Sequence, residues 1–428
     1  VKLFKTMTGN DCAPTAPVDP VIVKSWARKL AREIRQILEP VTIRRNRLDL
    51  RADPDYSQEV TKLSDMCPPV EQFYELSTEQ SKFYEEIIND YFGEDGRFKG
   101  AIYQPFTYEK GMAEQLDEQG NREMHQQANL YDFMRRLLVK RFESSFGSFR
   151  QSIENFERVH KLVRDFIDKT GKYVLDRIMV ERISDWDVDA IDDALNQFVT
   201  SQEERARPKN AKIYEINKFA DAKKFRDDLD SDIALFGELL RRMDDLGLCD
   251  NDPKAKKLVE VLGAVLAGKH PDIPPVAGEP LRKVVIFSEY ADTVRHLQPI
   301  LEARFPGKSL QVVGQISNTL ASIVEKDFDA SVKGKEQTNH YQVLLTTDKM
   351  SEGHNLHRAG LVINYDIPWN PIRVIQRVGR INRIGHKVFN TLYIFNFFPT
   401  EVGAPIARSR EIATQKMFMI HNTIGEDA

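Results

Sequence analysis

The chain has 428 residues, 41% of them hydrophobic and 29% charged, and a formal net charge of −4. These values are typical of a globular protein with room for two or three cores, and they exclude a disordered chain and a uniformly basic one. The sequence contains no apolar run near the roughly 18 residues that a membrane span requires, and its cysteines are far apart, without a CxxC pair. We therefore expect a protein of the reducing cytoplasm with no membrane contact and no metal site.

The first 270 residues are expected to be mainly α-helical. Apolar residues recur at helical spacing in four stretches, which are 21–38, 78–92, 130–167 and 225–243. In the last stretch Phe225, Leu229 and Phe236 fall on one face, as in helices that pack in pairs. The charged segment 200–212 is expected to be an exposed loop, and the proline-rich segment 268–280 is expected to lead into a different kind of structure.

From residue 283 onward the sequence alternates between strands and helices. Apolar runs predict strands at 283–288, 310–316, 342–347, 361–366 and 391–398. Helical segments lie between them at 289–305, with a bend expected near Pro299, and at 320–328. This alternation predicts an α/β fold in which a parallel sheet carries helices on both faces. Ligands of such sheets bind beyond the carboxyl ends of the strands.

A helix with clear end signals is expected at 371–384. Asn370 precedes it as N-cap, Pro371 occupies its first position, and Gly385 stands where a left-handed residue commonly ends a helix. Four arginines share one face of this helix, because they are spaced i, i+4, i+7 and i+10: Arg373, Arg377, Arg380 and Arg383. Adjacent cations repel one another, so we expect an anion to face them.

The sequence lacks a loop of the form GxxxxGK[ST], with which a chain can hold ATP by itself. Residues 302–309 end in the required Gly-Lys-Ser, but Glu302 replaces the first glycine, and the segment runs from helix to strand instead of from strand to helix. The acidic run 117–120 follows no apolar strand, so it is not expected to bind magnesium. The arginines therefore suit a triphosphate that is held elsewhere.

Two segments carry a resemblance to a known family. VLLTTDKMSEGHNL (343–356) and LVINYDIPWNPIRVIQRVGRINRIGH (361–386) resemble motifs V and VI of superfamily 2 helicases, in the Swi/Snf-type group with its bacterial RapA-like ATPases. KVVIFSEY (283–290) is similar to motif IV, and residues 40–90 more weakly resemble the linker between the motor lobes. Such motors have two RecA-like lobes, and ATP with magnesium lies between them, bound mainly by the first lobe.

The resemblance implies that this chain, which opens on Val1, is a C-terminal fragment whose first lobe is absent. On this interpretation the end of the first lobe and the linker occupy 1–93, and a helical insertion follows at 94–270. The RecA-like C-terminal lobe then spans 271–400, and a final helix spans 401–428. Lys and Arg outnumber Asp and Glu by 15 to 10 between residues 282 and 398, so positive charge is concentrated on the lobe.

Motif VI implies catalytic roles for three side chains. By their positions in QRVGRINR, Arg380 and Arg383 would act as arginine fingers on the γ-phosphate. Gln376 would lie near the attacking water or the nucleotide. Arg377 is expected to brace motif V through a charge-assisted pair with Asp348, close to the nucleotide.

Motifs IV and V imply binding roles. Thr347 matches the threonine that contacts the nucleic-acid backbone, and Ser288 of motif IV is expected to join it. Gly353 would allow close approach to the nucleotide, and Asn355 stands where many relatives have a ribose-contacting Asp. Glu352 agrees with the Ser-Glu-Gly of RapA-like proteins and is assigned to the same nucleotide site.

The expected function is that of a nucleic-acid-dependent ATPase, most simply a double-stranded DNA translocase whose isolated C-terminal lobe is inactive. Phosphate contacts would carry no sequence information. Two alternatives stay open. One is a protein-interaction module that uses the insertion at 94–270 as its partner surface, and the other is a helicase that separates RNA or DNA strands.

Overall fold

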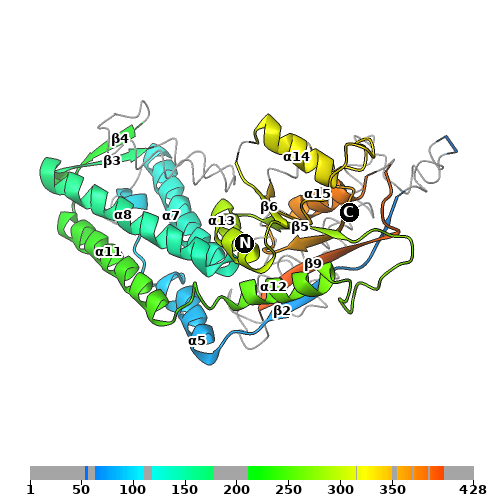
Figure 1. Cartoon of the computed structure of the whole chain (residues 1–428). Helices are drawn as coiled ribbons and strands as arrows, with labels where there is room; N and C mark the ends of the chain where they lie inside the picture. Colours follow the sequence, from blue (N-terminus) through cyan, green and yellow to red (C-terminus); the bar gives the residue numbers. More distant parts are fainter. Residues whose placement is uncertain are drawn as a thin grey trace, which may run out of the picture.

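The computed structural model describes residues 54–55, 63–109, 118–176, 211–314, 316–348, 354–368, 371–383 and 386–399. Several sequence-based expectations fall outside these ranges: the helices at 21–38 and 401–428, Glu352, Gly353, Asn370 and Gly385. The described residues form a lobe built on a β-sheet and a long helical arm beside it (Figure 1).

The lobe contains a seven-stranded sheet in which every neighbouring pair is parallel. Its order is β1-β9-β8-β5-β7-β6, and β2 extends the edge beside β1 by pairing with β9. The strands are β1 (Asp65–Met66), β2 (Val70–Tyr74), β5 (Lys283–Ser288), β6 (Ser309–Val312), β7 (Val343–Thr347), β8 (Ala359–Asn364) and β9 (Thr391–Pro399). The predicted parallel sheet is confirmed, and β5 has the predicted bounds.

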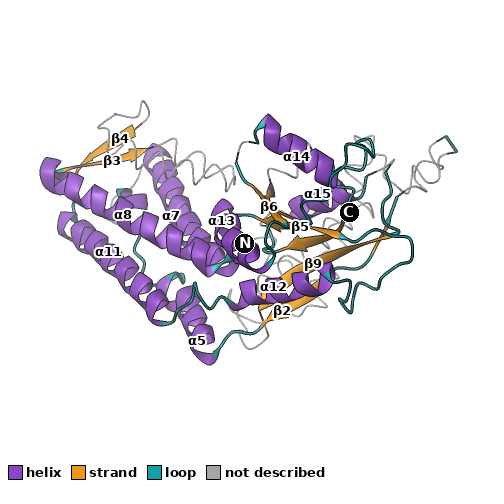
Figure 2. Ribbon diagram, in the orientation of Figure 1, coloured by secondary structure: helices purple, strands orange, loops and turns teal. Residues whose placement is uncertain are grey.

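Helices cover both faces of this sheet (Figure 2). They are α12 (Pro253–Leu266) and α13 (Ala291–Arg304) on one face, and α14 (Asn318–Phe328) and α15 (Pro371–Ile381) on the other. Successive residues of a strand point to opposite faces, so Ile286 of β5 packs with α12 and α13, whereas Val285 packs with α14 and α15. This arrangement is the expected RecA-like α/β fold.

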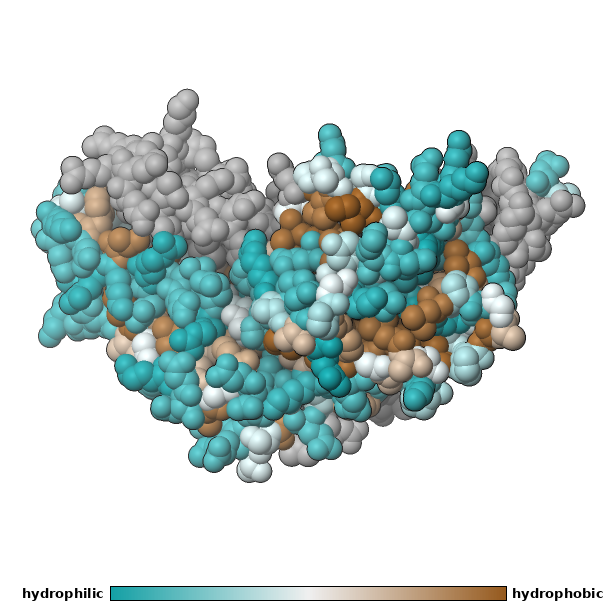
Figure 3. All heavy atoms as spheres, in the orientation of Figure 1, coloured by the Kyte–Doolittle hydropathy of each residue, from teal (hydrophilic) through white to brown (hydrophobic). Residues whose placement is uncertain are grey.

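The arm is a bundle in which α8 lies between α7 and α11 (Figure 1). Its elements are α5 (Thr78–Glu86), η1 (Ile87–Tyr91), η2 (Ala101–Tyr103), α6 (Phe106–Glu109), α7 (Glu118–Ser144), α8 (Phe146–Thr170), β3 (Lys172–Asp176), β4 (Ala211–Glu215), η3 (Ile216–Lys218) and α11 (Ala222–Asp245). Aromatic side chains dominate its core, among them Phe98, Phe149, Phe156 and Phe236. The arm presents mainly hydrophilic residues on the face drawn in Figure 3.

The arm has two features that the sequence analysis did not predict and one that corrects a prediction. The stretch 130–167 is two helices, because Ser145 adopts an extended conformation and caps α8 by accepting a hydrogen bond from the Ser148 amide at 3.0 Å. The antiparallel hairpin β3–β4 was not expected, although Tyr173 and Leu175 alternate as buried residues. The predicted loop at 200–212 ends within β4, which begins at Ala211.

The corner between α7 and α8 is fixed to the lobe by polar contacts. The Lys254 ammonium of α12 donates hydrogen bonds at 2.9 Å to the carbonyls of Glu143 and Ser144, which lie at the C-terminus of α7. Arg141 of α7 forms an ion pair with Asp292 of α13 at 2.8 Å. No helix within the described ranges is long and apolar enough to cross a membrane.

Candidate functional site

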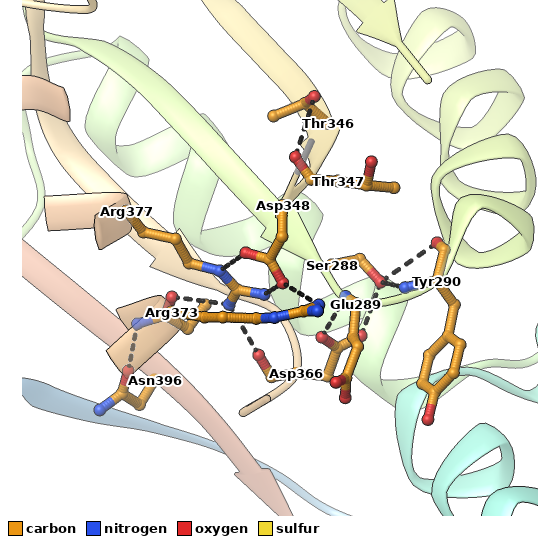
Figure 4. Close-up of polar contacts among 11 residues, drawn as sticks. Ser288, Glu289, Tyr290, Thr346, Thr347, Asp348, Asp366, Arg373, Arg377 and Asn396 are labelled. Carbon is orange, nitrogen blue, oxygen red and sulfur yellow. Dashed lines mark hydrogen bonds and ion pairs between the residues drawn. The ribbon is translucent and has the colours of Figure 1, made fainter. Parts of the chain in front are cut away.

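The candidate site lies at the carboxyl ends of β5, β7 and β8, where parallel strands bring their last residues together (Figure 4). Ser288 ends β5, Asp348 follows β7, and Asp366 lies just beyond β8. Helix α15 packs against β8 and supplies Arg373 and Arg377 to this edge. Charged side chains from segments far apart in the sequence thus meet at one end of the sheet.

Arg377 is the centre of this site and has no exposed surface. Its Nε and Nη2 donate to the two carboxylate oxygens of Asp348 at 2.5 and 2.8 Å. Its Nη1 donates to Asn364 Oδ1 at 2.9 Å and to the Asp366 carbonyl at 3.1 Å. Burial opposes the charge of the guanidinium, but Asp348 outweighs it, so the pKa of Arg377 is raised. The expected pairing with Asp348 is confirmed, whereas the nucleotide-binding roles of both residues stay predictions.

The contacts of Arg377 continue across the sheet beneath α15. Asn364 Nδ2 donates to Asn396 Oδ1 at 2.8 Å, so a chain of polar contacts connects Asp348, after β7, with β8 and β9. Arg373 approaches the same carboxylate, with its Nη1 3.6 Å from Asp348 Oδ2. These contacts set which face of α15 points toward the sheet, because the buried Arg377 guanidinium makes two directed hydrogen bonds to one carboxylate.

The predicted helix at 371–384 is too long, since α15 ends at Ile381. The Asn382 amide closes the last turn on the Val378 carbonyl at 3.1 Å, and the Asn382 carboxamide exchanges hydrogen bonds with the backbone of Ser64. Arg383 therefore lies beyond the helix, and the four arginines do not form one helical stripe.

The three predicted catalytic side chains are less buried than Arg377. Gln376 is exposed, and Arg380 is half-buried. The exposed Arg383 donates from Nη1 to Asn355 Oδ1, so the structure brings these two predicted residues together. The chain segments that carry them are also joined by a backbone hydrogen bond, in which the Leu356 amide donates to the Arg380 carbonyl at 3.0 Å.

Ser288 is fully buried and binds a carboxylate that the sequence did not single out. Its hydroxyl donates to Asp366 Oδ2 at 2.6 Å, and so does the hydroxyl of Ser144 from the α7–α8 corner. The Glu289 amide donates to Asp366 Oδ1 at 2.6 Å. Sequence reasoning could have found Asp366 from its position directly after a buried strand, but the contribution of Ser144 had no local signal.

Glu289 is a second acidic side chain that the sequence reasoning missed. It is buried, and burial together with the negative charges of Asp366 and Asp348 raises its pKa to about 8, against the opposing effect of Arg377 and Arg373. Glu289 therefore holds a proton at neutral pH.

Thr347 is buried, and its hydroxyl oxygen has no hydrogen-bond partner within the described residues. The neighbouring Thr346 is satisfied, because it donates to the Val312 carbonyl at 2.8 Å. An unpaired buried hydroxyl costs free energy, so a ligand atom that bonded to it would relieve that cost.

Comparisons with known proteins agree with this geometry. Residues 271–385 match the family model of the helicase conserved C-terminal domain. The chain is 34% identical over 123 residues to the ATP-dependent helicase YqhH of Bacillus subtilis, which is 27% of this chain and 18% of that protein. It is 30% identical over 112 residues to the RNA polymerase-associated protein RapA of Vibrio cholerae, which is 26% of this chain and 11% of that protein.

Solved structures are similar at lower identity. The C-terminal part of the Fun30 ATPase domain is 14% identical, with a TM-score of 0.36 over 85% of this chain and 99% of the other. The Hef helicase domain of Pyrococcus furiosus is 14% identical, with a TM-score of 0.38 over 84% of this chain and 60% of the other. The chain spans less than a fifth of the length of the curated relatives named above. Residues 271–385 therefore match the helicase conserved C-terminal domain, and the chain is similar over about a quarter of its length to these curated relatives.

Proposed function

We propose that the chain works as the second lobe of a nucleic-acid-dependent ATPase, most simply a double-stranded DNA translocase of the cytoplasm. Arg380 and Arg383 would be its arginine fingers, and the ATP with magnesium would be bound mainly by a first RecA-like lobe. The observation that carries this proposal is the buried pair of Arg377 and Asp348 at the carboxyl end of the sheet. It ties the helix that bears Arg380 to motif V, where Asp348 follows β7.

The proposed finger role has a simple electrostatic basis. Hydrolysis moves negative charge onto the oxygens of the transferred phosphoryl group, and a guanidinium fork placed there stabilises the transition state. Such placement requires a rigid support. Arg377 supplies one, because its buried guanidinium contacts Asp348, Asn364 and the Asp366 backbone together. Gln376, Asn355, Glu352 and Gly353 are proposed to complete the nucleotide side of the site.

Nucleic acid is proposed to contact the same end of the sheet through Thr347 and Ser288. The unpaired hydroxyl of Thr347 supports a phosphate contact there. Ser288 is covered, since Ser144 shares its carboxylate partner, so a phosphate would reach Ser288 only after the α7–α8 corner moved. Contacts of this kind bind the backbone without reading bases, as a translocase requires.

The decisive experiment is nucleic-acid-stimulated ATP hydrolysis by the protein together with a lobe that contains the GxxxxGK[ST] loop. Arg380→Ala is expected to lower kcat by about 10³ while nucleic-acid affinity is unchanged, because arginine fingers contribute about 10³–10⁵ in rate. Lys387→Ala, an exposed cation beyond the same helix, is the matched control and should keep full turnover. Normal turnover of Arg380→Ala would reject the finger role, and the 428-residue chain by itself should not hydrolyse ATP.

Assays on the same protein distinguish the two alternative functions. Separation of strands in a tailed duplex would favour a helicase over a translocase, which should move along a blunt duplex without separating it. Retention of a partner protein through residues 94–270, without any dependence on ATP, would favour an interaction module.

A further inference from the structure

A second polar cluster lies at the end of α14, outside the network of Arg377. Asp329 is buried there, and its Oδ1 accepts hydrogen bonds from the Ser331 amide at 2.8 Å, the Ser331 hydroxyl at 2.7 Å and His357 Nδ1 at 3.1 Å. Its Oδ2 accepts one from Asn355 Nδ2 at 3.1 Å. Burial acts to raise the pKa of Asp329, but the donors from Ser331, Asn355 and His357 outweigh it, and the pKa lies below its usual value. Asp329 is therefore an ionised acceptor at neutral pH.

This carboxylate decides which way the Asn355 amide points. An ionised carboxylate only accepts hydrogen bonds, and a guanidinium only donates them. Asn355 lies between the two, because its Nδ2 faces Asp329 and its Oδ1 accepts from Arg383 Nη1. The opposite orientation would set donor against donor and acceptor against acceptor, so only one amide orientation satisfies both neighbours.

Arg383 needs such support more than the other arginines do. It lies past the end of α15 and is exposed, so neither helix geometry nor packing fixes its side chain. We infer that Asp329 is a positioning residue that holds Arg383 in place through Asn355, an inference that rests on the proposed finger role of Arg383. The same relay requires an amide, and not a carboxylate, at position 355. An Asp there would set two carboxylates about 3 Å apart, a contact that raises one pKa strongly.

An exchange of the two side chains tests the relay. Asn355→Asp alone places two carboxylates together. Asp329→Asn alone places two amides together, and the oxygen at position 329 still accepts from Ser331, so the new NH₂ faces the NH₂ of Asn355. The Asn355 amide would then turn and point its NH₂ toward Arg383. The double variant restores the pattern in reverse, because the new amide at position 329 would donate to the new carboxylate at position 355. That carboxylate would accept from Arg383, and the amide oxygen at position 329 would still accept from Ser331.

The readouts are kcat and KM for ATP in nucleic-acid-stimulated hydrolysis by the protein together with a lobe that contains the GxxxxGK[ST] loop, and the Tm of each variant. Each single variant is expected to lower kcat by at least about tenfold with little change in Tm, because small displacements of a catalytic group cost up to about 10² in rate. The double variant should return to within about threefold of the parent protein. Glu325→Gln, an exposed acid-to-amide change on α14, is the control and should change nothing.

Failure of this inference can be told apart from failure of the proposed function. If Arg383→Ala keeps full turnover, the finger role fails, and the relay fails with it. If Arg383→Ala loses turnover while either single variant keeps it, or the folded double variant does not recover, the relay alone is overturned. Adding Asp329→Asn to Arg383→Ala should cause no further loss, whereas a merely structural role of Asp329 predicts additive losses.

Discussion

The lobe and the arm bury charged groups in different ways. In the lobe, Arg377 contacts the Asp348 carboxylate and the Asp366 carbonyl at the carboxyl ends of strands, where a ligand of a parallel sheet would bind. In the arm, the buried Asp232 accepts hydrogen bonds from the backbone amides of Lys99 at 2.7 Å and Ala101 at 3.4 Å. Buried charges thus mark a site in the lobe and tie chain segments together in the arm, so burial alone does not identify function.

The largest effect is expected from breaking the buried pair in the lobe. Arg377→Ala leaves Asp348 buried without its bidentate partner, so the free energy of unfolding should fall by about 3–5 kcal/mol. In the arm, Arg164→Ala removes an exposed pair in which Arg164 Nε lies 2.9 Å from Asp230, and should cost at most about 1 kcal/mol. Urea unfolding of both variants gives the comparison. Equal losses of free energy in the two variants would show that the buried pair in the lobe stabilises the fold no more than the exposed pair in the arm.

A smaller effect is expected at the contact between the two regions. Ser144→Ala removes a hydroxyl that donates to the Asp366 carboxylate, and should cost about 1.5–3 kcal/mol, since hydrogen bonds to charged groups are the stronger ones. Ser152→Ala removes a bond to the neutral Ser148 carbonyl within α8, and should cost only about 1 kcal/mol. The same unfolding assay measures both changes. A smaller loss for Ser144→Ala would mean that the arm does not depend on Asp366.

The smallest expected effect is a difference between the lobe and the arm in the pH dependence of stability. Burial raises the pKa of Asp232 from 3.8 to about 7 and that of Glu289 from 4.5 to about 8. Both groups hold protons when folded that the unfolded chain releases, so stability falls as the pH rises through these windows, by at most about 1.4 kcal/mol per pH unit for each group. Of these two groups, Glu289 is the one that stays mainly protonated above pH 7. Glu289→Gln should therefore flatten the pH dependence of Tm between pH 7 and 8, whereas Asp232→Asn should flatten it mainly below pH 7. An unchanged slope above pH 7 in Glu289→Gln would contradict the assignment.

The sheet was predictable because its signal is local. Strands buried on both faces read as continuous apolar runs, and KVVIFS gave β5 with its observed bounds. The pair of Arg377 and Asp348 was predictable from the resemblance to helicases, because the two residues belong to motifs VI and V and the first was expected to brace the second. These parts required no knowledge of how distant segments pack.

The remainder depends on contacts that no local pattern encodes. Ser144 is 222 residues from Asp366 in the sequence, and nothing in the surrounding residues indicates that pairing. The amphipathic pattern continues through residues 130–167 although Ser145 divides the helix, because both halves bury their apolar faces in the same core. Likewise, Asn382, which directly follows α15, binds the backbone of Ser64, far upstream in the sequence.

The chain leaves the sheet at the end of β2 and returns at α12, and these two points are neighbours. The Lys254 ammonium lies 5.9 Å from the centre of the Tyr74 ring, and Gln80 donates to the Asn251 carbonyl at 3.4 Å. The two connections between the arm and the lobe therefore lie side by side. Growth, loss or replacement of the arm in evolution could therefore proceed without shifting the register of a single strand.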